Sequence, residues 1–255
     1  MAMESLLDYP LLVLVVAYIA CWAASLIGTR MRHKDDLEES VRDDVGVLLA
    51  AALTLLALII GFNLSTAIAR YDQRKNLEEA EANAIGTELV RTDLLPAADG
   101  AKLRTLLTQY VGQRIQFYIT RDEKAVSEIN ARTAKLQSDL WSAVVAPSLA
   151  QPTPISALAV AGMNDVLNSQ GYTQAAWWNR IPDGAWALMA IVAVCCNVLR
   201  GYGARSVQTK MLVPVLPFIV AISFFLIADI DSPRSGVIRV KPLNLNSLAD
   251  SLPAH

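Results

Sequence analysis

The stretch Gly46–Lys75 reads GVLLAAALTLLALIIGFNLSTAIARYDQRK, and it joins an apolar span to a charged continuation without a turn signal. Residues 46–64 carry no formal charge, and this is close to the roughly 20 residues of helix that cross a bilayer core. Charged residues begin at Arg70, and no proline interrupts the passage. We therefore expect one continuous helix that leaves the membrane and enters water, so that the span is rigidly coupled to the segment after it.

Small or weakly polar residues recur along this span at steps of three or four, which places them on one face of a helix. They are Gly46, Ala50, Thr54, Ala57, Gly61 and Ser65. Small residues usually mark close packing between membrane helices. The alternative is the lining of a pore or cavity, and the stripe by itself favours packing.

The composition combines 54% hydrophobic residues with 18% charged residues. Such a chain is too apolar for an ordinary soluble protein and too charged to be wholly embedded, which indicates a membrane protein with a substantial wet portion. The net charge of −2 offers no basic field for nucleic acid, so no nucleic-acid partner is expected.

Cysteine and histidine give no sign of a catalytic or metal site. Cys21, Cys195 and Cys196 all fall in predicted spans, where cysteine behaves as a small hydrophobe. The two histidines, His33 and His255, are too few for a histidine-based metal centre or catalytic triad. We expect no enzyme activity and no cofactor.

Four membrane spans are predicted from the apolar runs. They cover about residues 10–27, 46–64, 184–199 and 211–228. No Lys or Arg precedes the first run, so it is interpreted as a retained helix rather than a secretory signal. The first pair of spans belongs to residues 1–69 and the second pair to residues 181–228.

Residues 70–180 are predicted to form an extramembrane helical domain between the two pairs. Apolar side chains at helical spacing indicate helices around 103–118, 129–144 and 158–166, the second of them ending before Pro147. Convincing period-two patterns typical of strands are lacking in this segment, and a short β-like stretch, S-G-V-I-R-V at 235–240, follows the fourth span. The predicted fold class is all-α. Residues 229–255 are expected to be an acidic, proline-containing loop and a tail.

Two motifs and three shorter stretches carry a family resemblance. Gly61 and Phe62 precede R-Y-D-Q-R, which begins at Arg70, and the fourth span ends in L-I-A-D-I-D-S-P-R-S-G at 226–236. This order resembles the bestrophin superfamily of ion channels. The shorter stretches resemble its bacterial bestrophin-like branch, and they are E-E-A-E-A-N-A-I-G at 78–86, R-I-P at 180–182 and G-V-I-R-V at 236–240.

The resemblance implies a homopentameric ion channel in which the second spans surround the pore. In bestrophins, bulky apolar side chains at four-residue steps form a narrow neck, and Leu58 and Phe62 match them by position. Thr54 would be the third ring and departs from the pattern, because it is smaller and polar. This implies a shorter apolar gate, and apolar constrictions can gate by dewetting.

The same resemblance gives roles to residues around the neck. The small residues would pack neighbouring pore helices together, and they are Gly46, Ala50, Ala57 and Gly61. Arg70, Asp72 and Arg74 would place charges of mixed sign at the wet end of the pore or at an interface. The expected partners are membrane lipid, further copies of the chain and inorganic ions.

Asp229 and Asp231 stand where eukaryotic bestrophins use acidic residues to hold Ca²⁺. Carboxylate oxygens suit that cation, but two aspartates fall short of the six or more ligands it takes. A structural role, capping or pairing with Arg234 or Arg70, is therefore favoured over a metal site.

Two arguments about membrane orientation disagree. The resemblance implies an inner-membrane, multi-pass protein with its central domain in the cytoplasm. Basic residues of the short loops point the other way under the positive-inside rule; they are Arg30, Arg32, Lys34, Arg42, Arg200, Arg205 and Lys210. We expect the orientation of the family.

Two other functions remain as alternatives. The chain could be a non-conducting scaffold or sensor whose helical domain binds a protein partner. An embedded enzyme would need more than the D-x-D of Asp229 and Asp231, because no second carboxylate cluster, catalytic histidine or phosphate loop accompanies it.

Overall fold

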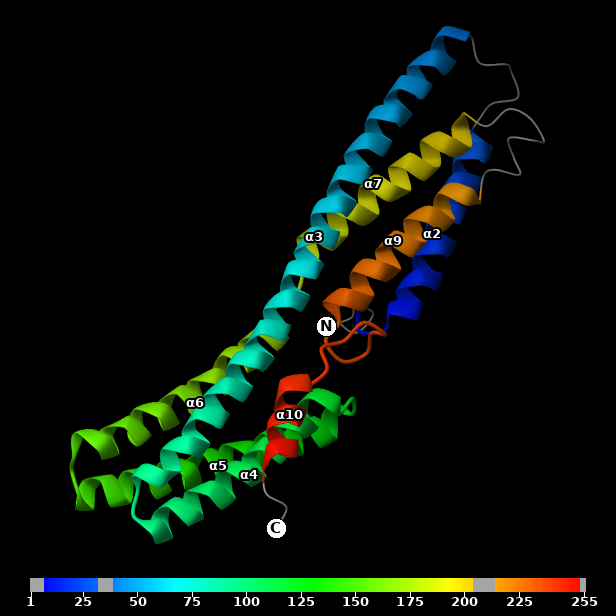
Figure 1. Ribbon diagram of the computed structural model, residues 1–255. Coiled ribbons are helices and arrows are strands. Elements are labelled where there is room, and N and C mark those ends of the chain that lie inside the picture. Colours follow the sequence, from blue (N-terminus) through cyan, green and yellow to red (C-terminus); the bar gives the residue numbers. More distant parts are fainter. Residues whose placement is uncertain (1–6, 32–38, 204–213, 253–255) are drawn as a thin grey trace. The chain divides into compact units, whose positions relative to one another are not determined.

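The computed structural model describes residues 7–31, 39–203 and 214–252, and it confirms an all-α fold, since every regular element in those ranges is a helix (Figure 1). The elements are α2 (Pro10–Met31), α3 (Glu39–Arg91), the short 3₁₀ helix η1 (Thr92–Leu94), α4 (Ala97–Ile119), α5 (Glu123–Ala150), α6 (Pro154–Trp178), α7 (Asp183–Tyr202), α9 (Val215–Asp231) and α10 (Leu243–Ser251). Several residues named in the sequence analysis lie outside the described ranges: His33, His255, Arg32, Lys34, Arg205, Lys210 and residues 211–213 of the predicted fourth span.

The chain divides into two compact units. The first, here called the apolar unit, comprises Met1–Arg70 and Arg180–Arg239. The second, the helical unit, comprises Tyr71–Asn179 and Val240–His255. Helix α3 belongs to both, and no turn interrupts it from Glu39 to Arg91, as the absence of breakers predicts.

In the apolar unit, α2 packs against both α7 and α9. The backbones of α2 and α7 approach closely where two glycines face the other helix. A Cβ on Gly28 would collide with the backbone of Val198, and one on Gly201 would collide with the backbone of Ser25. Ser25 and Asn197, both buried, share a hydrogen bond of 3.2 Å at this clamp. Small residues thus bring two membrane helices together, as they commonly do in lipid.

The apolar half of α3 contrasts with α2. Only 6% of its most apolar window is buried, against 28% for α2. Leu56 and Ala67 are the fully buried positions between residues 43 and 70. Leu56 and Ala67 share one face of α3, because the eleven residues between them make about three full turns. Leu58 lies about half a turn around the axis from each, on the opposite face.

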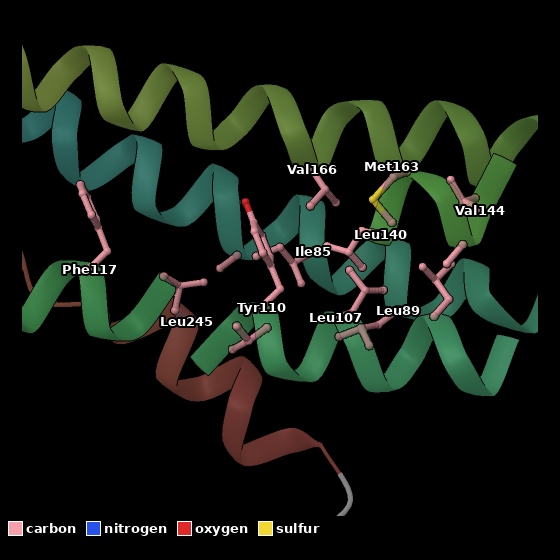
Figure 2. Packing of buried hydrophobic residues seen from close by; sticks show 14 of the residues in the cluster. Ile85, Leu89, Leu107, Tyr110, Phe117, Leu140, Val144, Met163, Val166 and Leu245 are labelled. Carbon is pink, nitrogen blue, oxygen red and sulfur yellow. The ribbon is translucent and has the colours of Figure 1, made fainter. Parts of the chain in front are cut away.

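The helical unit has its core where α4, α5 and α6 meet the second half of α3 and the short α10. Figure 2 shows this cluster: Ile85 and Leu89 from α3, Leu107, Tyr110 and Phe117 from α4, Leu140 and Val144 from α5, Met163 and Val166 from α6, and Leu245 from α10. Helix α10 lies in the segment that we expected to be a loop and tail, and its Leu245 is fully buried.

Local signals explain where α5 and α6 begin. The Asp122 carboxylate accepts a hydrogen bond from the backbone N–H of Ala125, and Thr153 and Ser156 form a reciprocal capping box with Pro154 in the first turn. The prediction that the helix ends before Pro147 is wrong, because α5 continues to Ala150. Pro147 lies in the last turn, where it removes one backbone hydrogen bond without stopping the helix.

Three helical stretches of the described chain are long and apolar enough to cross a membrane, namely Pro10–Met31, Asp43–Leu94 and Pro154–Tyr202. Helix α9 carries no charged residue before Asp229, but it has 17 described residues, slightly fewer than a typical span. The count of four spans therefore stays a prediction.

Candidate functional site

The proposed neck residues lie on the outward face of α3. Leu58 is 54% exposed and Phe62 is 64% exposed in the single chain, although both are large apolar side chains in a membrane span. Thr54 is also exposed. Steps of four residues keep the three on one helix face. An apolar face that the chain itself leaves uncovered is available to lipid, to another subunit or to a pore.

The Thr54 hydroxyl has no free donor to present to a pore. It donates a hydrogen bond of 2.9 Å to the backbone carbonyl of Ala50, one turn earlier. This local bond uses the only donor of the side chain. The side chain therefore presents its methyl group and an acceptor oxygen, and not a free hydroxyl donor, to its surroundings.

The small residues lie on a neighbouring face of α3 and are open as well. Gly46, Ala50, Ala57 and Gly61 are exposed, and no other atom lies within 4 Å of where a Cβ on Gly46 or Gly61 would be. The close packing predicted for this stripe therefore has no partner among the described residues of a single chain.

The three charged residues predicted for the wet end do not share one environment. Asp72 is exposed and Arg70 is half-buried. Arg74 is only 2% exposed, and its Nε donates a hydrogen bond of 3.3 Å to the Ala176 carbonyl. Arg74 thus holds α3 against α6 inside the helical unit.

The two aspartates in the last turn of α9 bind backbone amides. The Asp229 carboxylate accepts hydrogen bonds from the N–H groups of Val237 (2.7 Å) and Ile238 (2.8 Å). The loop that makes this possible passes so close that a Cβ on Gly236 would collide with the Asp229 carbonyl oxygen. A glycine is therefore required at this position of the motif, and Asp229 folds the loop onto the end of α9.

Asp231 ties the end of α9 to the chain before α7. Its carboxylate accepts from the Ile181 N–H at 3.2 and 3.3 Å and lies 3.6 Å from the Arg180 Nε. Arg180 also pairs with Asp8 and donates to the Leu7 carbonyl at 3.4 Å. The R-I-P stretch thus supplies Arg180 as a partner of Asp231, which the sequence analysis did not name. No group of three or more metal-ligating side chains occurs in the residues that the structure describes.

A buried polar network that the sequence analysis missed lies in the helical unit. The carboxylate of Glu81 binds the Arg114 guanidinium and also accepts from Tyr118 (3.2 Å) and Thr173 (3.2 Å). Glu81 and Arg114 are fully buried, and the Arg114 guanidinium lies 4.5 Å from the centre of the Phe117 ring. Burial, together with the Glu81 charge, raises the pKa of the Tyr118 hydroxyl.

Glu78, one turn before Glu81, fastens the C-terminal helix. Its carboxylate accepts from the Leu245 N–H at 2.9 Å and from the Asn244 side chain at 2.6 Å. A carboxylate at the first turn of α10 matches the partial positive charge there. Glu78 and Glu81 of the E-E-A-E motif thus face inward, whereas Glu79 is exposed. Their signal in the sequence was the spacing from Glu78, which is three residues to Glu81 and seven residues to buried Ile85.

A third glutamate of this helix, Glu88, is buried without a hydrogen-bond donor among the described residues. Its charged neighbour is Arg91, 3.8 Å away. Burial raises the pKa of the Glu88 carboxyl to about 8, with Arg91 opposing the shift and Asp165 adding to it. Gly162 of α6 packs against this pair so closely that a Cβ there would collide with both side chains.

Comparisons with known proteins agree on the fold. Crystal structures of a bacterial bestrophin homologue from Klebsiella pneumoniae match with 14% identity and a TM-score of 0.62; one covers 93% of this chain and 95% of that chain, and another covers 94% and 99%. At this identity the likeness shows the fold. No curated protein matches the sequence significantly.

The family is shown by a model of the bestrophin-like domain, which matches residues 12–245. This range includes the exposed face of α3, the Asp229 loop and the first turn of α10. The chain belongs to the bestrophin-like family.

Proposed function

We propose that this chain is one subunit of a homopentameric ion channel, with a passive conducting path lined by the first half of α3. The carrying observation is the exposed apolar face of Leu58 and Phe62. Five such helices around an axis would bring these side chains together as an apolar neck, with Thr54 as a third, smaller ring. Dewetting of such a neck is a recognised way to gate a channel.

The neighbouring stripe of α3 supports assembly of the same helices. Gly46, Ala50, Ala57 and Gly61 are open in the single chain, and small residues allow membrane helices to approach each other. The neck and the stripe lie on adjacent faces, so one helix can line a pore with the first and contact its neighbour with the second. Asp72, exposed beyond the neck, would face ions or a neighbouring subunit.

The remaining parts of the proposal follow the family. The protein belongs in the bacterial inner membrane with the helical unit in the cytoplasm, and its partners are lipid, its own copies and inorganic ions. No enzymatic reaction is proposed. Asp229 and Asp231 act as structural carboxylates, since backbone amides and Arg180 already occupy them.

Ion flux in liposomes tests the proposal. Purified protein is reconstituted and compared with Phe62→Ala and Leu58→Ala, under chloride and potassium gradients imposed separately. Ile191→Ala is the matched control, because Ile191 is 62% exposed on α7 and lies outside the proposed neck. We expect flux through the wild type that rises or changes selectivity in the two α3 variants alone. Equal flux from all four proteins would contradict the proposal that Leu58 and Phe62 of α3 form the neck.

A second function has one observation in its favour. Between the end of α5 and the start of α6, an apolar groove of about 820 Å³ opens beside Leu149 and Trp141, which are 76% and 39% exposed. Such a surface suits a protein partner, as a scaffold or sensor would need. The scaffold or sensor function would be favoured if neither the wild type nor the two α3 variants conducted ions while native mass spectrometry showed intact pentamers.

A further inference from the structure

The apolar unit contains a pocket that neither the neck nor the assembly of α3 uses. It has a volume of about 170 Å³ and lies between α2 and α7, with α9 behind it. Every residue around it is apolar, and Val16, Ala20, Trp186, Ala190, Val194 and Phe224 are among them. An apolar cavity of about 150 Å³ stays dry and accepts an apolar guest such as benzene.

The pocket exists because α2 and α7 are clamped at one end only. Gly28 and Gly201 bring the two backbones together near the ends of both helices. Farther toward the starts of both helices, the pocket is lined by Ala20 and Ala190, whose short side chains leave space between the helices. Phe224 and Trp186 form the floor, with their rings edge to face at 6.1 Å.

The mouth of the pocket opens to the outside of the apolar unit. Val16 and Val194 on its rim are 42% and 38% exposed, and Ala20 and Ala190 are exposed too. Both walls belong to helices that are long and apolar enough to span a membrane. In a bilayer, a mouth between two such helices would face hydrocarbon.

One polar group lies among the apolar walls. The indole nitrogen of Trp186 is buried and has no hydrogen-bond acceptor among the described residues, and the side chain as a whole is 5% exposed. An unpaired buried donor is costly, and Trp N–H groups usually find a partner. A ligand for this pocket should thus be apolar and carry one acceptor.

The position of Trp186 along the membrane agrees with such a ligand. Trp186 lies in the first turn of α7, a few residues after Arg180, which pairs with Asp8 and Asp231. Tryptophan beside a charged cluster is typical of the boundary between hydrocarbon and headgroups. Ester carbonyls of glycerophospholipids lie at that depth.

We propose that this pocket holds one glycerophospholipid, with an acyl chain between α2 and α7 and an ester carbonyl accepting a hydrogen bond from the Trp186 indole N–H. The assignment does not depend on conduction, because it rests on α2, α7 and α9. It predicts one resident lipid per chain, distinct from the lipid that covers the rest of the surface.

Native mass spectrometry of the purified protein tests the site. After delipidation in detergent, the protein is titrated with a diester phosphatidylglycerol. We expect one lipid per chain to bind to the wild type, and at least fivefold weaker binding to Ala190→Phe and to Ala20→Leu, which fill the pocket from its two exposed walls. Ile191→Ala, next to Ala190 but outside the pocket, should bind as the wild type does.

A diether lipid of the same chain length tests the carbonyl. The wild type should prefer the diester about fivefold, the value expected for one hydrogen bond of about 1 kcal/mol, and Trp186→Phe should show no preference. Equal binding to the wild type and the filled variants would overturn the proposal, as would a resident free fatty acid. Loss of the oligomer in Ala190→Phe with lipid binding intact would assign the pocket to a second copy of the chain.

Discussion

The two halves of α3 reverse the usual relation between polarity and burial. In the first half, apolar side chains such as Phe62 are exposed in the single chain, whereas in the second half Arg74, Glu78, Glu81 and Glu88 are buried. The reason is the surroundings: lipid or another subunit covers an apolar face at little cost, while buried charges need partners within the chain. Helix α3 therefore makes most of its contacts within the chain through its charged half, while most of its apolar half stays uncovered in the single chain.

The strongest test of this contrast is the Glu81–Arg114 pair. Arg114→Ala leaves a fully buried Glu81 carboxylate without its cation, although the hydroxyl groups of Tyr118 and Thr173 still donate hydrogen bonds to it. We expect a loss of about 3–5 kcal/mol in unfolding free energy, seen as a lower Tm by circular dichroism in detergent. Arg132→Ala is the control, because its pair with Glu128 is about two-thirds exposed on both sides, and its cost should stay below about 1 kcal/mol.

Glu88 should make the stability of the charged half depend on pH. Its pKa of about 8 in the folded protein exceeds the value of about 4.3 in an unfolded chain. The folded state therefore holds the extra proton between these values, and stability falls as pH rises through this window, by at most about 1.4 kcal/mol per pH unit. In Glu88→Gln this dependence should vanish: Tm matches the wild type near pH 4 and exceeds it at pH 9. A higher wild-type Tm at pH 9 would contradict the assignment.

Glu78 should matter most for the C-terminal helix. Glu78→Ala removes the acceptor of the Leu245 N–H and of the Asn244 amide, and we expect a loss of about 1–3 kcal/mol. Hydrogen exchange should show faster exchange in α10 before the rest of the unit changes. Glu79→Ala is the neighbouring control, since Glu79 is exposed; equal effects of the two would mean that the carboxylate does not fasten α10.

The smallest effect on folding is expected in the apolar half. Gly61→Ala should change the unfolding free energy of the chain by less than about 1 kcal/mol, because nothing lies within 4 Å of the new methyl group. The same variant should lower the fraction of oligomer in native mass spectra if the stripe packs neighbouring subunits. Gly28→Ala reverses the pattern, since its methyl group meets the Val198 backbone, and should destabilise the chain itself.

Sequence patterns predicted the continuous α3 and the all-α class, because these depend on local features: the absence of breakers between Gly61 and Lys75 and the spacing of apolar residues. The buried glutamates escaped prediction, since a charged stripe on a helix is usually solvated. Their burial depends on Arg114 and on α10, both far away in sequence. The role of Arg180 was also missed, because its partners Asp8 and Asp231 are far from it in the sequence.

The composition of the helical unit from two separate stretches has a consequence for biosynthesis. Glu78 is translated early, but the residues that complete its surroundings, Asn244 and Leu245, follow α7 and α9. Until the ribosome has passed both of these apolar helices, the Glu78 carboxylate lacks these two donors and Leu245 is missing from the core. The unit therefore reaches its final packing only after insertion of the later membrane segments, and a nascent chain halted before residue 240 should be open to proteases at α4, which α10 contacts in the finished protein.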